Sequence, residues 1–404
     1  MIKLLLGGSP CTHWSIAQTK NRETEPSGIG WDLFENYLIA LDKFQPDYFL
    51  YENNKSMSRQ IREEIPKRVG FEPICINSAL VSAQNRQRLY WVGKRNQDGI
   101  YSQVEVEQPE DRGILLRDIF ETGMAWNEKG YCLAANRGGH SLPHDLVFGK
   151  NNYAAEPVRI GTIESDARNQ EECDSKQYRV YSPDGKSVTL CGQGGGVGAK
   201  TGLYAVPTNC DVVVTENNIR CQRRDKKHST VQGSHVSFCD SKSQTMSPSH
   251  VPNIIETASG KTVPVYEVRD GFISIKGKQY PIKLADGFYI IRKLTVTECK
   301  RLQTVPDSYL FPVSDTQAYK MLGNGWTVDV IVYLLSHCDG VTADPVDALS
   351  MYDGMGCGHI ALNRLGATIH RYRATEIDKY AIKTVRHNFP DIKQLGDAFQ
   401  VREW

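Results

Sequence analysis

A cysteine, a carboxylate and two arginines stand in the first part of the chain where they could carry out nucleophilic chemistry. Cys11 comes just after a first short apolar run, Glu52 ends a second, and Arg86 and Arg88 precede a third. If these runs are neighbouring strands, their ends bring thiol, carboxylate and guanidinium together. A thiol has a reference pKa of ~8.5, so a nucleophilic Cys11 needs surroundings that favour the thiolate.

A glycine-rich turn near the other end of the chain has the spacing of a nucleotide site. The turn 353–358 reads Asp-Gly-Met-Gly-Cys-Gly after an apolar run, and Glu376 ends the next run. Such glycines let a ligand approach the backbone, and an acid after the second strand binds ribose hydroxyls. The spacing is not Gly-x-Gly-x-x-Gly, and Asp353 before the first glycine favours a nucleoside over a pyrophosphate. An ordinary strand-to-helix turn is the alternative.

Three stretches of sequence must position these groups. Residues 1–112 and 285–404 alternate short apolar runs with helical periodicity, which indicates an α/β sheet. Residues 113–284 are rich in Gly, Ser, Asn and Asp with short β-branched runs, which indicates a loop-rich, mostly β region. The expected strands are 2–6, 48–51, 89–92, 348–352 and 374–377, and the expected helices are 31–44, 61–69, 296–302, 328–335 and one from about 360. A nucleotide half-site at the C-terminal end is explained by circular permutation, which compact domains tolerate.

Composition excludes several classes of protein. The 404 residues carry 48 Lys and Arg against 47 Asp and Glu, so neither a disordered polyelectrolyte nor a histone-like protein is expected. No apolar run reaches the ~18 residues of a membrane span. The 11 cysteines are scattered with no Cys-x-x-Cys, which argues against a metal site or disulfide framework and favours a reducing cytoplasm.

Taken in order, the motifs resemble those of the DNA cytosine-C5 methyltransferases. The matching segments are Gly-Ser-Pro-Cys11, Glu52-Asn-Asn, Gln84-x-Arg-x-Arg88, Arg301-Leu-Gln303 with Pro306, and Gly323-Asn324. The glycine turn follows at the end instead of the start, so the chain resembles a circularly permuted member of phage or bacterial type. The resemblance implies a Rossmann-like class I methyltransferase sheet, with an inserted target recognition domain at 113–284.

The resemblance also implies a catalytic set. Cys11 would add to C6 of a flipped-out cytosine, and Glu52 would hold N3 and the exocyclic amine. Arg88 would bind O2 of the base and orient Glu52, while Arg86 supports the loop or the charge. The methyl donor would be S-adenosyl-L-methionine.

Most of the cofactor residues are expected in the C-terminal stretch. Tyr352 would stack on adenine, Glu376 would take the ribose hydroxyls, and Asp397 would meet the adenine amine. Ile377 stands where many members have Trp, and Gly325-Trp326 replaces a small residue followed by valine. The remaining cofactor residues are expected to be Asp353, Gly354, Gly356, Gly358, Pro10, Asn324 and Trp326.

Double-stranded DNA is the expected partner, and its target base must be flipped at a cost of a few kcal/mol. The loop after Cys11 would contact DNA through Thr12, His13, Ser15 and Gln18, with Trp14 and Arg22 in the same loop. The basic run at 220–228 is either a solvated face or a phosphate-contacting patch formed by Arg220, Arg223, Arg224, Lys226 and Lys227. Residues 194–201 nearly match the phosphate-binding P-loop pattern and are interpreted as a DNA-facing loop.

Other interpretations stay open at this point. They are a non-catalytic DNA-binding regulator, an RNA cytosine-C5 methyltransferase of the same family, and a free-nucleotide pyrimidine methylase. The intact catalytic set argues against the regulator, and the long middle region argues against the other two. The chain is expected to be a cytoplasmic monomer in a bacterial or phage-infected cell. A cognate restriction endonuclease or a phage self-protection role would both fit.

Overall fold

The computed structural model describes residues 1–10, 13–15, 22–119, 121 and 295–403, together with strand segments between 159 and 292. These residues form two compact units. The first unit contains Met1–Ile114 and Thr295–Trp404, and the second contains the described residues between 115 and 294. The two ends of the chain therefore build one unit together.

The first unit is a mixed sheet with the strand order β18-β17-β16-β1-β2-β4-β3, and β5 pairs with β4. Strands β18, β17, β16, β1 and β2 are parallel, whereas β4 runs antiparallel to β2 and β3. In chain order the strands are β1 (Ile2–Gly7), β2 (Tyr48–Asn54), β3 (Ile74–Asn77), β4 (Gln87–Arg95), β5 (Tyr101–Gln103), β16 (Val346–Met351), β17 (Ile369–Thr375) and β18 (Lys393–Gly396).

The centre of this sheet is buried on both faces. Every residue of β2 and β16 is buried, as is expected of parallel strands covered by helices. From β16 the chain continues outward through β17, whereas from β1 it continues to the other side through β2. The order therefore reverses between β16 and β1, and α/β sheets bind ligands beyond the carboxyl ends of the strands at such a point.

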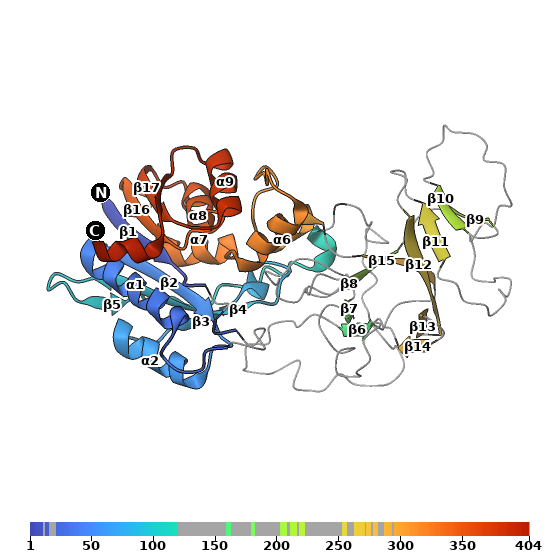
Figure 1. Cartoon of the computed structure of the whole chain (residues 1–404), viewed down its shortest axis with the longest axis horizontal. Helices are drawn as coiled ribbons and strands as arrows, with labels where there is room; N and C mark the ends of the chain where they lie inside the picture. Colours follow the sequence, from blue (N-terminus) through green and yellow to red (C-terminus); the bar gives the residue numbers. More distant parts are fainter. Residues whose placement is uncertain are drawn as a thin grey trace. The chain divides into compact units, whose positions relative to one another are not determined.

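Helices cover both faces of the sheet. Figure 1 shows α1 and α2 on one side of it, and α7, α8 and α9 on the other. A capping box joins Thr295 to Glu298 at the start of α5, and Ser58 caps α2. The helices are α1 (Ile29–Phe44), α2 (Arg59–Val69), α5 (Val296–Leu302), α6 (Asp315–Asn324), α7 (Val328–Ser336), α8 (Cys357–Leu365) and α9 (Lys379–Asn388), with 3-10 turns η1 (Ser78–Leu80), η2 (Leu116–Ile119) and η5 (Ala398–Glu403).

Aromatic rings fill the core between α1 and the sheet. Phe34 and Tyr37 of α1 pack on Tyr51 of β2, with ring centroids 5.2 and 4.9 Å apart, and Trp91 of β4 lies 5.6 Å from Tyr51. All four side chains are fully buried. These ring contacts fix strand β2, which carries Glu52 near its carboxyl end.

The second unit contains a sheet with the order β6-β7-β8-β15-β12-β11-β10-β9, to which β13 and β14 are attached. Strand β15 pairs with β12 and β8 and so belongs to this unit, although residues 285–292 were expected in the last stretch. The strands are β6 (Arg159–Thr162), β7 (Arg179–Tyr181), β8 (Leu203–Pro207), β9 (Asp211–Thr215), β10 (Asn218–Gln222), β11 (Asn253–Glu256), β12 (Thr262–Arg269), β13 (Phe272–Ile275), β14 (Lys278–Pro281) and β15 (Gly287–Arg292).

Several expected elements have shifted ends, and two of these shifts lie at the glycine turn and Glu376. The strand expected at 374–377 ends at Thr375, because the Glu376 side chain accepts the backbone N–H groups of residues 377 and 378 and turns the chain. The helix expected from about 360 already begins at Cys357, directly after the left-handed Gly356. Among the described residues, the structure contains no helix long and apolar enough to cross a membrane.

Candidate active site

The segment that leads to Cys11 is fixed by a buried polar cluster beyond β1. Ser9 is 3% exposed, and its hydroxyl shares a 2.7 Å hydrogen bond with the hydroxyl of Tyr51. The amide of Asn53 donates to the carbonyl and the hydroxyl of Ser9, each at 3.2 Å. The backbone at residue 9 is therefore held at the switch point, whereas Cys11 and Thr12 lie outside the described residues.

Glu52 lies beside this segment, and both oxygens of its carboxylate have partners. Arg88 Nε lies 3.0 Å from Oε1, and Trp326 Nε1 donates to Oε2 at 3.0 Å. Glu52 is 8% exposed, so these charge-assisted contacts are partly shielded from water. Burial and the neighbouring Glu52 carboxylate raise the pKa of Tyr90, which pairs with Glu52 across β2 and β4.

Arg86 reaches the segment that follows α6. Its guanidinium is buried and donates to the carbonyl of Gly323 at 3.2 Å and to that of Gly325 at 2.9 Å. Arg86 therefore holds the turn between α6 and α7, in which Asn324 is exposed and Trp326 partly buried. This contact favours the supporting role over the charge role among the two expected for Arg86.

Two more carboxylates, those of Asp353 and Glu376, follow the ends of β16 and β17. Glu376 Oε2 accepts the backbone N–H of Gly354 at 2.8 Å, so the acid and the glycine turn meet as expected. Gly354 and Gly356 have φ of 58° and 76°, which a side chain would strain. Ile377 follows with 72% of its surface exposed, an unusual position for a large apolar residue.

Asp353 is the electrostatically unusual group of the turn. Burial raises its pKa to about 6, and the Glu376 carboxylate adds to this rise. Tyr372 donates to Oδ1 at 2.8 Å, but Oδ2 is buried with no hydrogen-bond partner among the described residues. The Ser350 hydroxyl favours the ionised form from nearby without meeting hydrogen-bond geometry. A buried carboxylate in this state is stabilised by a cation.

Two further expected cofactor residues have local partners. Tyr352 has a φ of 61°, and its hydroxyl donates to the carbonyl of Leu33 in α1 at 2.6 Å. Asp397 accepts the N–H of Phe399 at 2.9 Å in the turn after β18. Gly358 is buried in the first turn of α8, and Pro10 is exposed beyond β1.

The loop after Cys11 is anchored more firmly than its polar composition suggested. Trp14 is fully buried, and its indole N–H donates to Glu23 at 3.2 Å. Glu23 also accepts the N–H of Gly30 at 3.0 Å and lies 3.4 Å from Nδ1 of His13. Arg22 donates to the carbonyl of Trp14 at 3.2 Å. Trp14 and Arg22 therefore have partners within the protein, although both belong to a loop that was expected to contact DNA.

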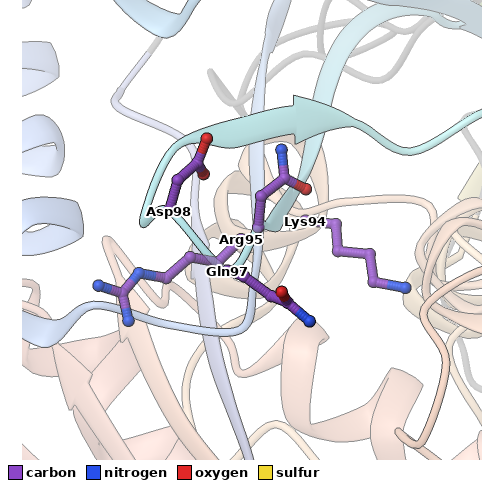
Figure 2. Close-up of a pocket in the computed structure, with 5 residues that line it drawn as sticks. Lys94, Arg95, Gln97 and Asp98 are labelled. Atoms are coloured by element: carbon purple, nitrogen blue, oxygen red, sulfur yellow. The ribbon is translucent and has the colours of Figure 1, made fainter.

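Most of the other residues expected to contact DNA lie outside the described residues. Ser15 is partly buried, and Gln18 lies outside the described residues, as do Arg223, Arg224, Lys226 and Lys227. Arg220 lies in β10 opposite Val213, and its side chain is not described. A surface hollow lined by Lys94, Arg95, Asn96, Gln97 and Asp98 (Figure 2) is at the opposite end of β4 from Arg88.

A model of the C-5 cytosine-specific DNA methylases matches residues 1–339. The chain belongs to this family. Its methyl donor is S-adenosylmethionine, and its members methylate cytosine in DNA.

The relatives of this DNA methylase are distant. It is 25% identical over 377 residues to the orphan methyltransferase M.SPRI of Bacillus phage SPR, a match that covers 81% of this chain and 80% of the relative. It is 22% identical over 338 residues to the type II methyltransferase M.FnuDI of Fusobacterium nucleatum, covering 82% and 74%. The solved structure of the Entamoeba histolytica methyltransferase EhMeth matches 82% of this chain and 77% of its own, with a TM-score of 0.39 and 11% identity.

The residues around the glycine turn fit the cofactor of this family. The sulfonium and ammonium groups of S-adenosylmethionine are cations, and the unpaired Oδ2 of Asp353 offers a buried negative partner. The exposed Ile377 offers an apolar surface for an adenine ring next to Glu376.

The hydrogen bond from the indole of Trp326 to Glu52 was not predicted from the sequence. Trp326 was expected in the cofactor pocket, but its N–H reaches Glu52, 274 positions earlier in the chain. The replacement of the family's small residue and valine by Gly325-Trp326 was the available signal. It marks the position as unusual without naming the partner.

Proposed function

We propose that this chain is a sequence-specific DNA cytosine-C5 methyltransferase that forms a covalent bond between Cys11 and C6 of the base. The supporting observation is the Glu52 carboxylate, held by Arg88 and Trp326 at the same sheet edge as the Asp353–Glu376 turn. A carboxylate fixed by two donors at the switch point of the sheet can recognise a base placed against the nucleotide turn.

The chemistry of cytosine explains this choice of residues. C5 is a poor nucleophile until the Cys11 thiolate adds to C6, which moves electron density to N3 and C5. Glu52 holds N3 and the exocyclic amine, and Arg88 binds O2 of the base, so the developing charge is stabilised. C5 would then take the methyl group, whose bond to the donor sulfur would break and leave a neutral thioether. A base removes the C5 proton, the C5–C6 double bond re-forms, and the Cys11 thiolate leaves.

The cofactor, when bound, supplies an electrophilic methyl group on a cationic sulfur. Asp353 is the group of this chain that would hold its positive charge, and Glu376 would take the ribose hydroxyls. Tyr352, Ile377 and Asp397 would bind the adenine. Pro10, Asn324, Gly354, Gly356, Gly358 and the ring of Trp326 would line the rest of the pocket.

We further propose that the catalytic fold is circularly permuted. Counted from β16, the order β18-β17-β16-β1-β2 becomes 3-2-1-4-5, which is the doubly wound order of nucleotide-binding folds. The family match ends at residue 339, before the strand and glycine turn that carry the half-site. Both observations support a chain that begins at the fourth strand.

The second unit is proposed to be the target recognition domain, from about 113 to 284 as expected from composition. Its separate β-rich sheet and the Arg220 strand support this role. The related methyltransferases from a phage and a bacterium support action on double-stranded DNA in the cytoplasm of such cells. We propose a monomer. Pairing with a cognate restriction endonuclease or use in phage self-protection remain the two roles to distinguish.

Methyl transfer to unmethylated duplex DNA tests this function. Labelled S-adenosylmethionine, followed by bisulfite sequencing, should place the label at C5 of cytosine in one short motif. Cys11→Ser should abolish the label, with S-adenosylmethionine still bound. Label on transfer RNA but not on DNA would overturn the proposal. So would cofactor binding without transfer to either substrate, which is the behaviour of a regulator.

A further inference from the structure

Trp326 lies between the two halves of the candidate site. Its Nε1 donates to Oε2 of Glu52 at 3.0 Å. A Cβ added to Gly8 would lie 3.2 Å from the same nitrogen, and one added to Gly358 would lie 3.8 Å from the indole ring at Cζ3. The indole therefore contacts the ends of β1 and β2 at one edge and the start of α8 at the other.

The backbone on both sides of Trp326 is fixed by buried hydrogen bonds. The carbonyl of Gly325 accepts from Arg86 at 2.9 Å and from Gln303 at 3.2 Å. Gln303 also accepts from the hydroxyl of Thr327 at 2.8 Å, and Thr327 accepts from that of Ser78 at 2.8 Å. All of these side chains are buried. The backbone that presents the indole is therefore fixed on both sides.

We infer that Trp326 is a positioning residue that fixes the Glu52 carboxylate for cytosine and joins it to the wall of the cofactor site. This inference rests on the proposed function. Arg88 holds one carboxylate oxygen and Trp326 the other, so together they fix the plane of the carboxylate. Either donor alone leaves that plane free to rotate. Glycine at residue 8 leaves space for both partners, because a Cβ there would lie 3.2 Å from Nε1 of Trp326 and 2.9 Å from Oε2 of Glu52.

A positioning role and a cofactor-wall role change different kinetic constants. If the N–H aligns Glu52, its loss weakens base recognition as charge builds on the ring, so kcat falls. If the ring only lines the cofactor pocket, its replacement raises KM for S-adenosylmethionine and leaves kcat intact. The two roles are therefore separable with one substitution that keeps an aromatic ring.

The test is Trp326→Phe, assayed for methyl transfer at saturating S-adenosylmethionine and saturating duplex DNA. We expect kcat to fall about tenfold, as loss of a hydrogen bond to a charged group predicts, with KM for S-adenosylmethionine changed less than threefold or so. Trp91→Phe is the matched control, because the buried indole N–H of Trp91 has no hydrogen-bond partner among the described residues. It should retain kcat within about twofold.

A double-mutant cycle with Glu52→Ala identifies the route of the effect. In single-turnover methyl transfer, Trp326→Phe should slow the Glu52→Ala enzyme less than about twofold, because the acceptor of the N–H is already gone. A full tenfold loss in that background would overturn the inference. So would an unchanged kcat with raised KM for S-adenosylmethionine in Trp326→Phe alone. Absence of methyl transfer by the unaltered protein would instead overturn the proposed function, and this inference with it.

Discussion

Two carboxylates of the candidate site, Glu52 and Asp353, differ in the partners that their oxygens have. Glu52, on the base side, has a cationic or N–H donor on each oxygen, from Arg88 and Trp326. Asp353, on the cofactor side, has one oxygen bound by Tyr372 and the other buried with no partner among the described residues. Both are 8% exposed, so burial alone does not explain the difference.

The difference shows that Glu52 finds a donor for each oxygen within the protein, whereas Asp353 keeps one oxygen without a partner among the described residues. The base side is organised in advance by donors from β4 and the turn before α7, as electrostatic catalysis requires. On the proposed cofactor side, the buried charge of Asp353 is unfavourable in the free protein, and a cationic ligand would relieve it. Binding energy on that side would therefore be gained partly from a group that destabilises the free protein.

The base side should show the largest effect. Glu52→Gln keeps the shape of the side chain but removes the charge that Arg88 and the base share. We expect kcat to fall about 100-fold or more, as for loss of a general acid–base group, with binding of S-adenosylmethionine unchanged by calorimetry. Glu35→Gln on the surface of α1 is the matched control and should keep full activity. A kcat within threefold of the parent would show that the base side is not organised around this carboxylate.

The cofactor side should respond in the opposite sense, losing affinity but gaining stability. Burial raises the pKa of Asp353 to about 6 in the folded protein. Between pH of about 4 and 6 the folded state therefore keeps a proton that the unfolded state has lost, and the free energy of unfolding falls as pH rises through this window. Asp353→Asn removes the buried charge and should raise the free energy of unfolding at pH 8 by up to about 3 kcal/mol.

Urea unfolding at pH 8 and pH 4 checks this stability gain, which should shrink at the lower pH. Calorimetry at pH 8 should show about tenfold weaker binding of S-adenosylmethionine by the variant. In the parent, affinity should rise as pH increases through about 6, and Asp353→Asn should lose that dependence. A variant that is less stable than the parent at pH 8 would contradict the idea of stored charge.

The smallest effect is expected at the apolar edge of the cofactor side. Ile377 is 72% exposed, so Ile377→Ser should change the free energy of unfolding by less than about 0.5 kcal/mol. Loss of an apolar surface for adenine should weaken S-adenosylmethionine binding about threefold to tenfold. Ile100→Ser is the control that should not change binding, because Ile100 is 64% exposed and lies in the turn between β4 and β5. Equal affinities of the two variants would remove Ile377 from the site.

The residues that end a strand could be placed from the sequence alone. Glu52 and Glu376 end apolar runs, and parallel strands bring their carboxyl ends to one edge, so their placement at one edge was predictable. The helix 296–302 was also predictable, since Thr295 and Glu298 form its capping box.

Contacts made across the fold were not predictable in the same way. The Trp326–Glu52 bond depends on how α6 and α7 pack on the sheet, and local spacing carries no information about that packing. Trp14 was placed with the polar residues of its loop, yet it is fully buried because Glu23 satisfies its indole N–H. The end of β17 was missed because a side chain, Glu376, competes for backbone N–H groups.

The central strand pairing of the sheet has a consequence for biosynthesis. Strand β1 pairs with β16, from Ile2 opposite Val346 to Gly7 opposite Met351. A ribosome therefore releases β1 and β2 long before β16, the second neighbour of β1, exists. One edge of β1 stays unpaired during most of translation. Closing such a long loop makes folding slow and leaves this edge open to pairing with other chains. Nascent chains stalled before residue 346 should accordingly aggregate or be held by chaperones, and folding of the catalytic unit waits for the last strands to emerge.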